Sequence, residues 1–357
     1  MKSLTERDGL LLKNWYIAAL SREVGKKPIQ RTLYDTALVL FRNNDGKVSC
    51  LNDRCLHRHA FLSKGEVFKG ELVCPYHGWL YDHTGQVSCV PSEGPESKPS
   101  QNLKLKSFPC VEQDGVIWVW MGPSDNNTDV PCPATPPWRF PEALNPDWIS
   151  YFMITDFENE VTNLAENFVD VPHTIFVHRG WFRDEKAVPK KVPTVVETKN
   201  GAVTVTYFQE EDEFSWGAKM LLNPGGHPMT HTDQFIMPNL TRVDYNFGSK
   251  NGFIINSQIS PVSTLKSRVY TYIAYKIPLF GMLFKPIISF YTRKVIEQDT
   301  VIMKNQGDCL RSDFRTTFRS TEADEVHKEI ERLRHYGVKG DSKLMSYEGK
   351  KEISFWI

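Results

Sequence analysis

Two short pairs of cysteine and histidine have the residue types and the spacing to bind a metal centre. They read Cys55-x-His57 and Cys74-x-x-His77. Thiolates and imidazoles in two pairs suit zinc, and they also suit a [2Fe–2S] cluster in which histidines replace the cysteines on one iron. Zinc fingers usually pair Cys with Cys and His with His, whereas each pair here holds one of each. This alternation favours the iron–sulfur cluster over a zinc-stapled fold, although His59 offers a further imidazole beside the first pair.

A second group of candidate ligands follows later in the chain. Glu166, Asp170 and His173 are spaced by four and three residues, so on a helix they would share one face. Pro172 is expected to end or kink that helix and to swing His178 towards His173. Two histidines, with a carboxylate added from elsewhere, form the 2-His-1-carboxylate site of non-haem Fe(II) oxygenases. The alternative is a surface helix whose acids and histidines are solvated.

Length, charge and cysteine content limit the class of protein. A chain of 357 residues is too long for one small core and suggests about two domains. Lysine plus arginine equals aspartate plus glutamate, at 43 each, so charge indicates neither a nucleic-acid nor an anionic-membrane partner. The seven cysteines show no disulfide framework, which predicts a reducing cytoplasm. The N-terminus has no signal-peptide core, and no stretch approaches the roughly 18 apolar residues of a membrane span.

Short strands and turns dominate residues 1–122. Residues 37–41 and 48–51 predict a hairpin around the turn at 43–46, and the first Cys/His pair follows it on a loop. Residues 115–121 predict a strongly apolar strand. An antiparallel β domain that carries the two pairs at the tips of two loops is therefore expected.

The rhythm changes at residues 123–147, where seven prolines predict an extended linker. Residues 148–357 combine β-branched strands with helices, which predicts a second domain with an antiparallel sheet and helices. The clearest predicted elements are strands at 202–208 and 241–247 and helices near 160–169, 285–306 and 322–336. The predicted fold class of the whole chain is α+β, with an all-β domain first.

Both ligand groups, in this order, resemble the catalytic subunit of the Rieske non-haem iron oxygenases over essentially the whole chain. The resemblance implies a Rieske [2Fe–2S] cluster whose ligands are Cys55, His57, Cys74 and His77. The family pattern Asp-x-x-His-x-x-x-x-His is matched by Asp170, His173 and His178, which implies the two histidines as ligands of a mononuclear Fe(II). The implied third ligand is Asp299, on a downstream helix. Glu297 ranks second because it would point to another face of that helix.

Further expectations come with this resemblance. It implies that Asp170 bridges a cluster histidine, His57 or His77, of one subunit and His173 of its neighbour in a homotrimer. A carboxylate that accepts the spare N–H of each imidazole would fix both rings and couple the two metals. Electrons would come ultimately from NAD(P)H through a separate ferredoxin or flavin reductase, because the chain has no dinucleotide fingerprint.

The implied reaction is reductive activation of O2 to attack a hydrophobic or aromatic small molecule. Asn14-Trp15-Tyr16 and the modest chain length resemble the monooxygenase, demethylase and pheophorbide a oxygenase-like branch, which implies hydroxylation or oxidative demethylation. Ring cis-dihydroxylation is the alternative, because Asn167-x-x-Asp170 is also typical of that group. A pure electron carrier would need only the Cys/His pairs and leaves His173, His178 and Asp299 unexplained. The apolar stretch 277–291 is expected to pack in the core or to line a channel rather than to contact a membrane.

Overall fold

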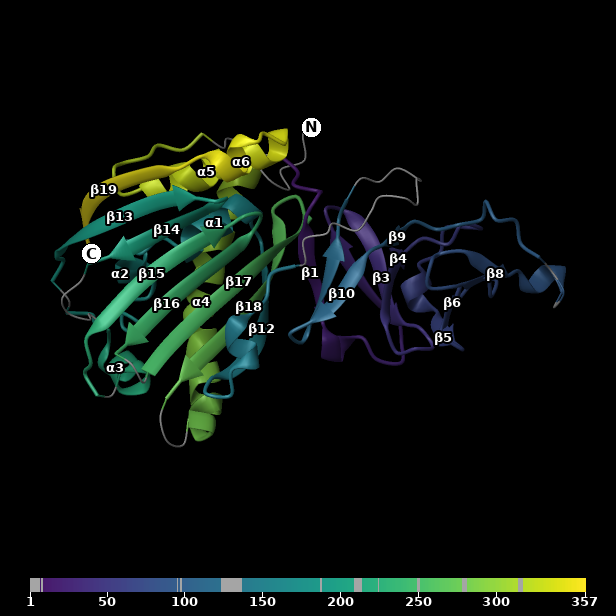
Figure 1. Ribbon diagram of the computed structural model, residues 1–357, viewed down its shortest axis with the longest axis horizontal. Helices are drawn as coiled ribbons and strands as arrows, with labels where there is room; N and C mark the ends of the chain where they lie inside the picture. The colour runs from purple at the N-terminus through teal and green to yellow at the C-terminus, as the bar shows by residue number, and fades with distance from the viewer. Residues whose placement is uncertain are drawn as a thin grey trace. The chain divides into compact units, whose positions relative to one another are not determined.

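The computed structural model describes residues 7, 9–94, 96, 98–122, 137–186, 188–208, 214–223, 225–248, 251–277, 281–313 and 317–357. The chain divides into two compact units (Figure 1). One is Leu12–Arg139, and the other combines the residues up to Leu11 with Phe140–Ile357. Of the predicted linker, residues 123–136 lie outside the described residues, and the remainder includes a short 3-10 helix at Pro141–Leu144. The exact domain limits stay a prediction.

Three small antiparallel sheets build the unit Leu12–Arg139. The first contains β1 (Trp15–Leu20), β11 (Val116–Trp120) and β10 (Cys110–Gln113). The second contains β2 (Ile29–Leu33), β3 (Thr36–Arg42), β4 (Val48–Asn52) and β9 (Ser107–Phe108). The third contains β5 (Glu66–Phe68), β6 (Glu71–Val73), β7 (Leu80–Tyr81) and β8 (Val87–Cys89). The predicted hairpin is confirmed as β3–β4, and the predicted apolar strand as β11.

One eight-stranded antiparallel sheet forms the centre of the C-terminal unit. Its order is β12 (Ile149–Phe157), β18 (Lys266–Lys276), β17 (Asn251–Ser263), β16 (Leu240–Phe247), β15 (Met229–Ile236), β14 (Ala202–Tyr207), β13 (Lys191–Lys199) and β19 (Gly349–Trp356). The helices are α1 (Val161–Phe168), α2 (Thr174–Val177), α3 (Trp216–Leu222), α4 (Gly281–Asp313), α5 (Glu325–Lys339) and α6 (Lys343–Ser346). None of the helices in these described residues is long and apolar enough to cross a membrane. The predicted α+β class is confirmed.

Hydrophobic patterning explains how the sheet and helices pack. Along β13 the residues Val192, Thr194, Val196 and Thr198 are buried and alternate with more exposed ones, which is the period of a strand with one covered face. Side chains of α1, α4 and α5 join the buried side chains of β13 and β14 in one core. The helices therefore cover one face of the sheet, and the candidate ligands of the second group lie between them and the strands.

Helix α4 is held against the turn between β12 and α1 by a buried asparagine. The Asn159 side-chain amide donates to the carbonyl oxygen of Met303 and to Gln306 Oε1, both at 2.8 Å. The Asn159 carbonyl side-chain oxygen accepts from the backbone N–H of Glu160, at 2.8 Å. Because α4 carries Asp299 and α1 leads into the histidine segment, this contact fixes one half of the second ligand group relative to the other.

Close packing at Gly307 of α4 gives a test of this interface. A Cβ atom there would lie 2.0 Å from the backbone oxygen of Glu158, so the helix and the turn must separate. We expect Gly307→Ala to lower the free energy of unfolding by about 1–3 kcal/mol, measured by chemical denaturation, although alanine is the better helix former. Gly217→Ala in α3 is the matched control, because its Cβ would meet nothing within 4 Å. Equal stability of the two variants would contradict the close approach.

The first residues of the chain were predicted to belong to the N-terminal β domain, and the structure groups them with the other unit. Those described up to Leu11 belong to the C-terminal unit. The Arg7 guanidinium pairs with Glu166 and with Glu331, the latter at 2.9 Å, and it lies 3.5 Å from Glu160. Three carboxylates, one each from the cap of α1, from α1 and from α5, thus hold a single arginine, which explains why this segment belongs to the C-terminal unit.

Candidate functional site

The two Cys/His pairs lie on two loops with the same backbone hydrogen bonds. In the first, the Cys55 N–H donates to Ala60 O and the Cys55 carbonyl accepts from the N–H of His59, at 2.9 and 3.0 Å. In the second, Cys74 makes the corresponding bonds with Trp79 and Gly78, at 2.8 and 3.0 Å. His59 and Gly78 occupy the same left-handed position, with φ of 58° and 70°. Both loops therefore present a buried cysteine and a histidine a few residues further on, as the sequence predicted.

The imidazoles of the two loops lie side by side. The ring centroids of His57 and His77 are 4.5 Å apart. His57 Nδ1 is buried and has no hydrogen-bond partner among the described residues, and such an orphaned nitrogen is satisfied by a metal bond. His59 is exposed, and its Nδ1 lies 2.9 Å from Arg54 Nη2, which supports His57 rather than His59 as the ligand. The four side chains thus fit the donor set of a [2Fe–2S] cluster with two histidines.

The predicted single helix face for Glu166, Asp170 and His173 is wrong. Helix α1 ends at Phe168, Asp170 lies in the turn that follows, and α2 begins only after His173. The physical reason is Pro172, because a proline has no N–H to donate to the carbonyl four residues earlier, that of Phe168, and its ring clashes with that carbonyl. Glu166 pairs with Arg7 and takes no part in the histidine site.

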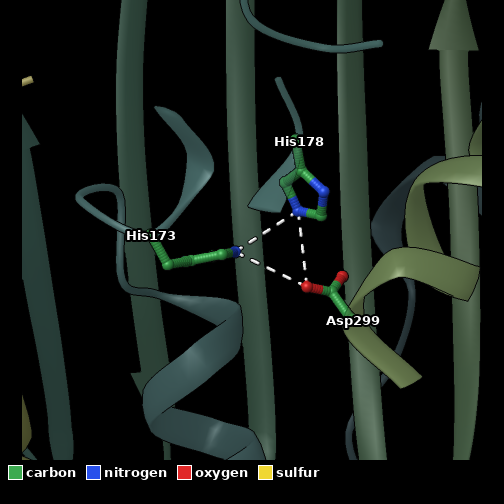
Figure 2. Close-up of side chains that lie close together, drawn as sticks. All are labelled: His173, His178 and Asp299. Atoms are coloured by element: carbon green, nitrogen blue, oxygen red, sulfur yellow. Dashed lines mark hydrogen bonds and ion pairs between the residues drawn. The ribbon is translucent and has the colours of Figure 1, made fainter. Parts of the chain in front are cut away.

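His173, His178 and Asp299 nevertheless come together as predicted (Figure 2). The Nε2 atoms of the two histidines are 3.3 Å apart, and they lie 3.5 and 3.3 Å from Asp299 Oδ1. A point at the centre of such a triangle is about 2 Å from each corner, which is the usual length of a metal–nitrogen or metal–carboxylate bond. This metal triad, as we call the three residues, fits the 2-His-1-carboxylate arrangement. Glu297 is half-exposed and pairs with Lys294, so it points away from the triad, as expected.

Hydrogen bonds on the outer nitrogens orient both rings towards the triad. His178 Nδ1 donates to Gln298 Oε1 at 3.1 Å, and His173 Nδ1 donates to the backbone oxygen of Asp170. In the neutral imidazoles these bonds place the proton on Nδ1, so that Nε2 can bind a metal. Burial lowers the pKa of His173, but Asp170 and Asp299 outweigh it and raise that pKa to about 9. The triad therefore has an electrostatic preference for positive charge, from a proton or from a metal.

The carboxylate of Asp170 lies against the outer side of this site. Its Oδ2 is 3.7 Å from His173 Nδ1, and its side chain is about one quarter exposed. The predicted contact with His173 is thus possible within one chain. The part of the prediction that involves a neighbouring subunit stays a prediction.

Two residues around the triad were not predicted to contact it, although Asn167 belongs to the spacing Asn167-x-x-Asp170. Asn167 donates from Nδ2 towards Asp299 Oδ1 at 3.3 Å and lies 3.4 Å from His173 Nε2. Gln298 fixes the ring of His178, as described above. Gln298 precedes Asp299 in the sequence, but adjacent residues on a helix point in different directions. The position of Gln298 therefore did not indicate that it contacts His178.

A cavity opens beside the metal triad. It is open to solvent, and all three triad residues line it. Most of the other lining side chains are apolar, among them Phe182, Leu222 and Ile255. The apolar stretch 277–291 is only partly buried: Tyr291 lines this cavity and Ile288 lies in the core. The expectation that the stretch packs in the core or lines a channel is wrong for its exposed side chains, which are Met282, Leu283, Phe284, Ile287 and Phe290, and residues 278–280 lie outside the described part of the chain. A metal at the triad would thus face a space that fits a hydrophobic small molecule.

Family models match both units. Residues 14–109 match the Rieske [2Fe-2S] domain, and residues 158–336 match the vanillate O-demethylase oxygenase C-terminal domain. The second match alone covers half of the chain, 179 of its 357 residues.

Individual relatives and solved structures agree with these matches. The oxygenase component of dicamba O-demethylase from Stenotrophomonas maltophilia is 37% identical over 46% of the chain and 47% of its own length. A putative toluene-4-sulfonate monooxygenase iron-sulfur subunit from Comamonas testosteroni is 32% identical over 58% of each chain. The matched segments thus span about half of these relatives' own length. Dicamba monooxygenase bound to dicamba superposes with a TM-score of 0.78 at 21% identity, over 93% of this chain and 99% of that one, which shows a shared fold.

Proposed function

The chain belongs to the Rieske non-haem iron oxygenases, and from this premise we propose that it is an oxygenase component that hydroxylates or oxidatively demethylates a hydrophobic or aromatic small molecule. The observation that carries the proposal is the metal triad at the wall of an apolar cavity. A metal bound by two histidines and one carboxylate would keep coordination positions open. The cavity beside the triad has space for a substrate and O2 next to those positions. An electron carrier has no use for such a cavity.

The proposal assigns two cofactors to the two groups of ligands. Cys55, His57, Cys74 and His77 hold a [2Fe–2S] cluster, and the metal triad holds a mononuclear Fe(II). When bound, the cluster supplies single electrons and the iron supplies a site for O2 activation. The protein itself orients the ligands through Gln298 and Asp170, and the apolar side chains of the cavity hold the substrate against the triad.

Electron supply and assembly are parts of the same proposal. The electrons come ultimately from NAD(P)H through a separate ferredoxin or flavin reductase, and Asp170 bridges a cluster histidine of one subunit to His173 of the next in a homotrimer. Side-chain exposure supports the bridge, because His77 is exposed and Asp170 is partly so. None of the described cysteines forms a disulfide, which supports a reducing cytoplasm as the location.

Hydroxylation or demethylation ranks ahead of ring cis-dihydroxylation in this proposal. The match of residues 158–336 to an O-demethylase domain supports that order. Both reactions consume one O2 and two electrons, and they differ in what the cavity presents to the iron. Product analysis therefore has to decide between them.

A screen of the purified protein tests the function. We expect a red-brown protein with a rhombic EPR signal after reduction and with iron beyond the two atoms of the cluster. The reduced protein should be mixed with O2 and with aromatic methyl ethers, N-methyl compounds and polycyclic hydrophobic compounds, one at a time. At least one compound should give hydroxylated or demethylated product in step with O2 uptake.

Several outcomes would contradict the proposal. A colourless protein that contains zinc would indicate a zinc-stapled module instead. A protein that is reduced and reoxidised at the cluster but binds no further iron would indicate an electron carrier. O2 uptake without product does not contradict the proposal, because it indicates only that the compound is unsuitable. Product must therefore be measured for every member of the panel.

A further inference from the structure

The cavity beside the metal triad is apolar on most of its surface. Val243, Phe253, Ile255 and Ile273 contribute from the sheet, and Val295 contributes from α4. Walls of this kind bind the hydrophobic body of a ligand, and the few polar groups among them set its orientation and specificity. The identity of those polar groups therefore limits the substrate.

Among the described residues that line this cavity, the charged ones other than histidine are all acidic. They are Asp170, Asp233 and Asp299, and no lysine or arginine lines it. Asp170 and Asp299 lie at the metal triad, whereas Asp233 belongs to β15 in the sheet. The buried Arg183 donates from Nε to Thr174 Oγ1 at 2.9 Å and does not line the cavity. Asp233 is thus a carboxylate in this cavity that the metal triad does not use.

Two donors hold the Asp233 carboxylate in place. Its Oδ1 is 2.8 Å from His231 Nε2, and its Oδ2 accepts from the Tyr207 hydroxyl at 3.1 Å. The His231 ring is sandwiched between Tyr207 and Tyr245, with ring centroids 4.6 and 4.2 Å away, so its orientation is fixed too. Each carboxylate oxygen has a second position at which it can accept a hydrogen bond. The group that this cluster offers to the cavity is therefore an acceptor.

Other polar groups of the cavity also offer acceptors. The Tyr291 hydroxyl donates to the backbone oxygen of Trp181 at 2.6 Å, and the Thr292 hydroxyl donates to that of Ile288 at 2.8 Å. Both hydroxyls donate their proton to the protein and can offer a ligand only lone pairs, one of which on Thr292 already accepts from the Tyr151 hydroxyl at 2.8 Å. Asn167 Oδ1 is buried without a hydrogen-bond partner among the described residues. A ligand that brings its own donors would satisfy this set.

Building on the oxygenase function proposed above, we propose that Asp233 is the polar anchor of the substrate, which is a hydrophobic molecule with an ammonium, N–H or O–H donor and not a carboxylate or sulfonate. A buried organic anion near Asp233 would place two like charges in an apolar space, which is costly. A donor group instead completes the unused acceptor position. The toluene-4-sulfonate monooxygenase relative is named for an anionic compound. The substrate proposed here differs from that compound, because it is not an anion.

Three probes that share a ring and a methyl ether test the inference: 4-methoxybenzylamine, 4-methoxybenzyl alcohol and 4-methoxybenzoate. Their dissociation constants are measured by calorimetry without O2, on the protein that carries both metals. We expect the amine and the alcohol to bind at least about 10-fold more tightly than the benzoate. In Asp233→Asn the ratio should fall to within about 3-fold, because the anchor has lost its charge and one acceptor. Glu197→Gln removes an exposed carboxylate from β13 of the same sheet and should keep the wild-type ratio.

Tyr207→Phe is a second variant with the opposite expectation. It removes the donor to Asp233 Oδ2 and keeps the ring, so the preference for the amine should persist or increase. Cluster absorbance and thermal melting show whether each variant is folded. Tight binding of the benzoate to the wild type, absence of binding by both the amine and the alcohol, or loss of the preference in Tyr207→Phe would overturn the inference. A benzoate that binds and is demethylated would overturn it and leave the oxygenase function intact, whereas selective binding without O2-dependent product from any compound would count against the oxygenase function alone.

Discussion

Replacement of His173 by alanine is expected to reduce O2-dependent product formation by at least about 100-fold. His173 supplies one of the three corners of the metal triad, and its Nε2 lies 3.3 and 3.5 Å from the other two. Without it, one histidine and one carboxylate remain, which is too few for a stable site. The [2Fe–2S] cluster should remain, because its ligands lie in the unit Leu12–Arg139, which has hydrophobic cores of its own. Iron analysis should show loss of the mononuclear iron, with the visible absorbance and the EPR signal of the cluster unchanged.

His335→Ala is the matched control for this experiment. His335 is an exposed residue of α5 in the same unit, and its loss should leave iron content and turnover at the wild-type level. Full turnover in His173→Ala would mean that the iron lies elsewhere. Loss of the cluster together with the mononuclear iron would argue against two separate sites.

The cluster loops were predictable because their chemistry is local. Each pair lies within a few residues, and each loop closes on itself through hydrogen bonds from one cysteine to the residues that follow it. The spacing within Cys55-x-His57 and Cys74-x-x-His77 is therefore enough to locate the ligands. What the spacing cannot give is the contact between the loops, which depends on how the sheet β5–β8 and the strand β4 pack.

The three residues of the metal triad could be predicted from the sequence, but the local structure of the segment that carries the two histidines could not. Asp299 is far from the histidines in sequence, and it reaches them through the packing of α4 on the turn at Asn159. A helical spacing rule assigned Glu166 to the same site, yet α1 ends before Asp170 and Glu166 pairs with Arg7. The rule failed because a tertiary ion pair and a proline, both outside the periodic pattern, decide where that segment turns.

The cavity was the part that sequence could not supply. His231 and Asp233 alternate along β15, so a strand prediction would place them on one face. This alternation is a usable signal for a buried polar pair. Nothing in sequence, however, shows that Tyr207 of the next strand donates to the carboxylate or that the pair borders the triad. Burial of a charge in an apolar wall is a property of the assembled sheet and helices.

Asp170→Asn is expected to keep both metals bound and to lower coupled turnover by about 100-fold, because outer partners of metal ligands typically contribute that much. The substitution preserves the shape of the side chain and removes its charge, 3.7 Å from His173 Nδ1. An amide in place of the carboxylate no longer stabilises positive charge on the imidazole. If the carboxylate also bridges to a cluster histidine of the next subunit, the rate at which O2 and substrate reoxidise the reduced cluster should fall with turnover. Stopped-flow absorbance of the cluster measures that rate directly.

The cluster rate separates a bridge from a local role. Asp184→Asn removes an exposed carboxylate from the same unit and should keep both the cluster rate and turnover at the wild-type level. If Asp170→Asn slows product formation but leaves cluster reoxidation fast, the carboxylate acts on His173 within one chain and the bridge is wrong. If both rates stay at the wild-type level, Asp170 has no role in coupling. If Asp170→Asn retains both metals but slows both cluster reoxidation and product formation, the result supports the bridge. The charge of the Asp170 side chain would then be required for electron transfer between the two metal sites.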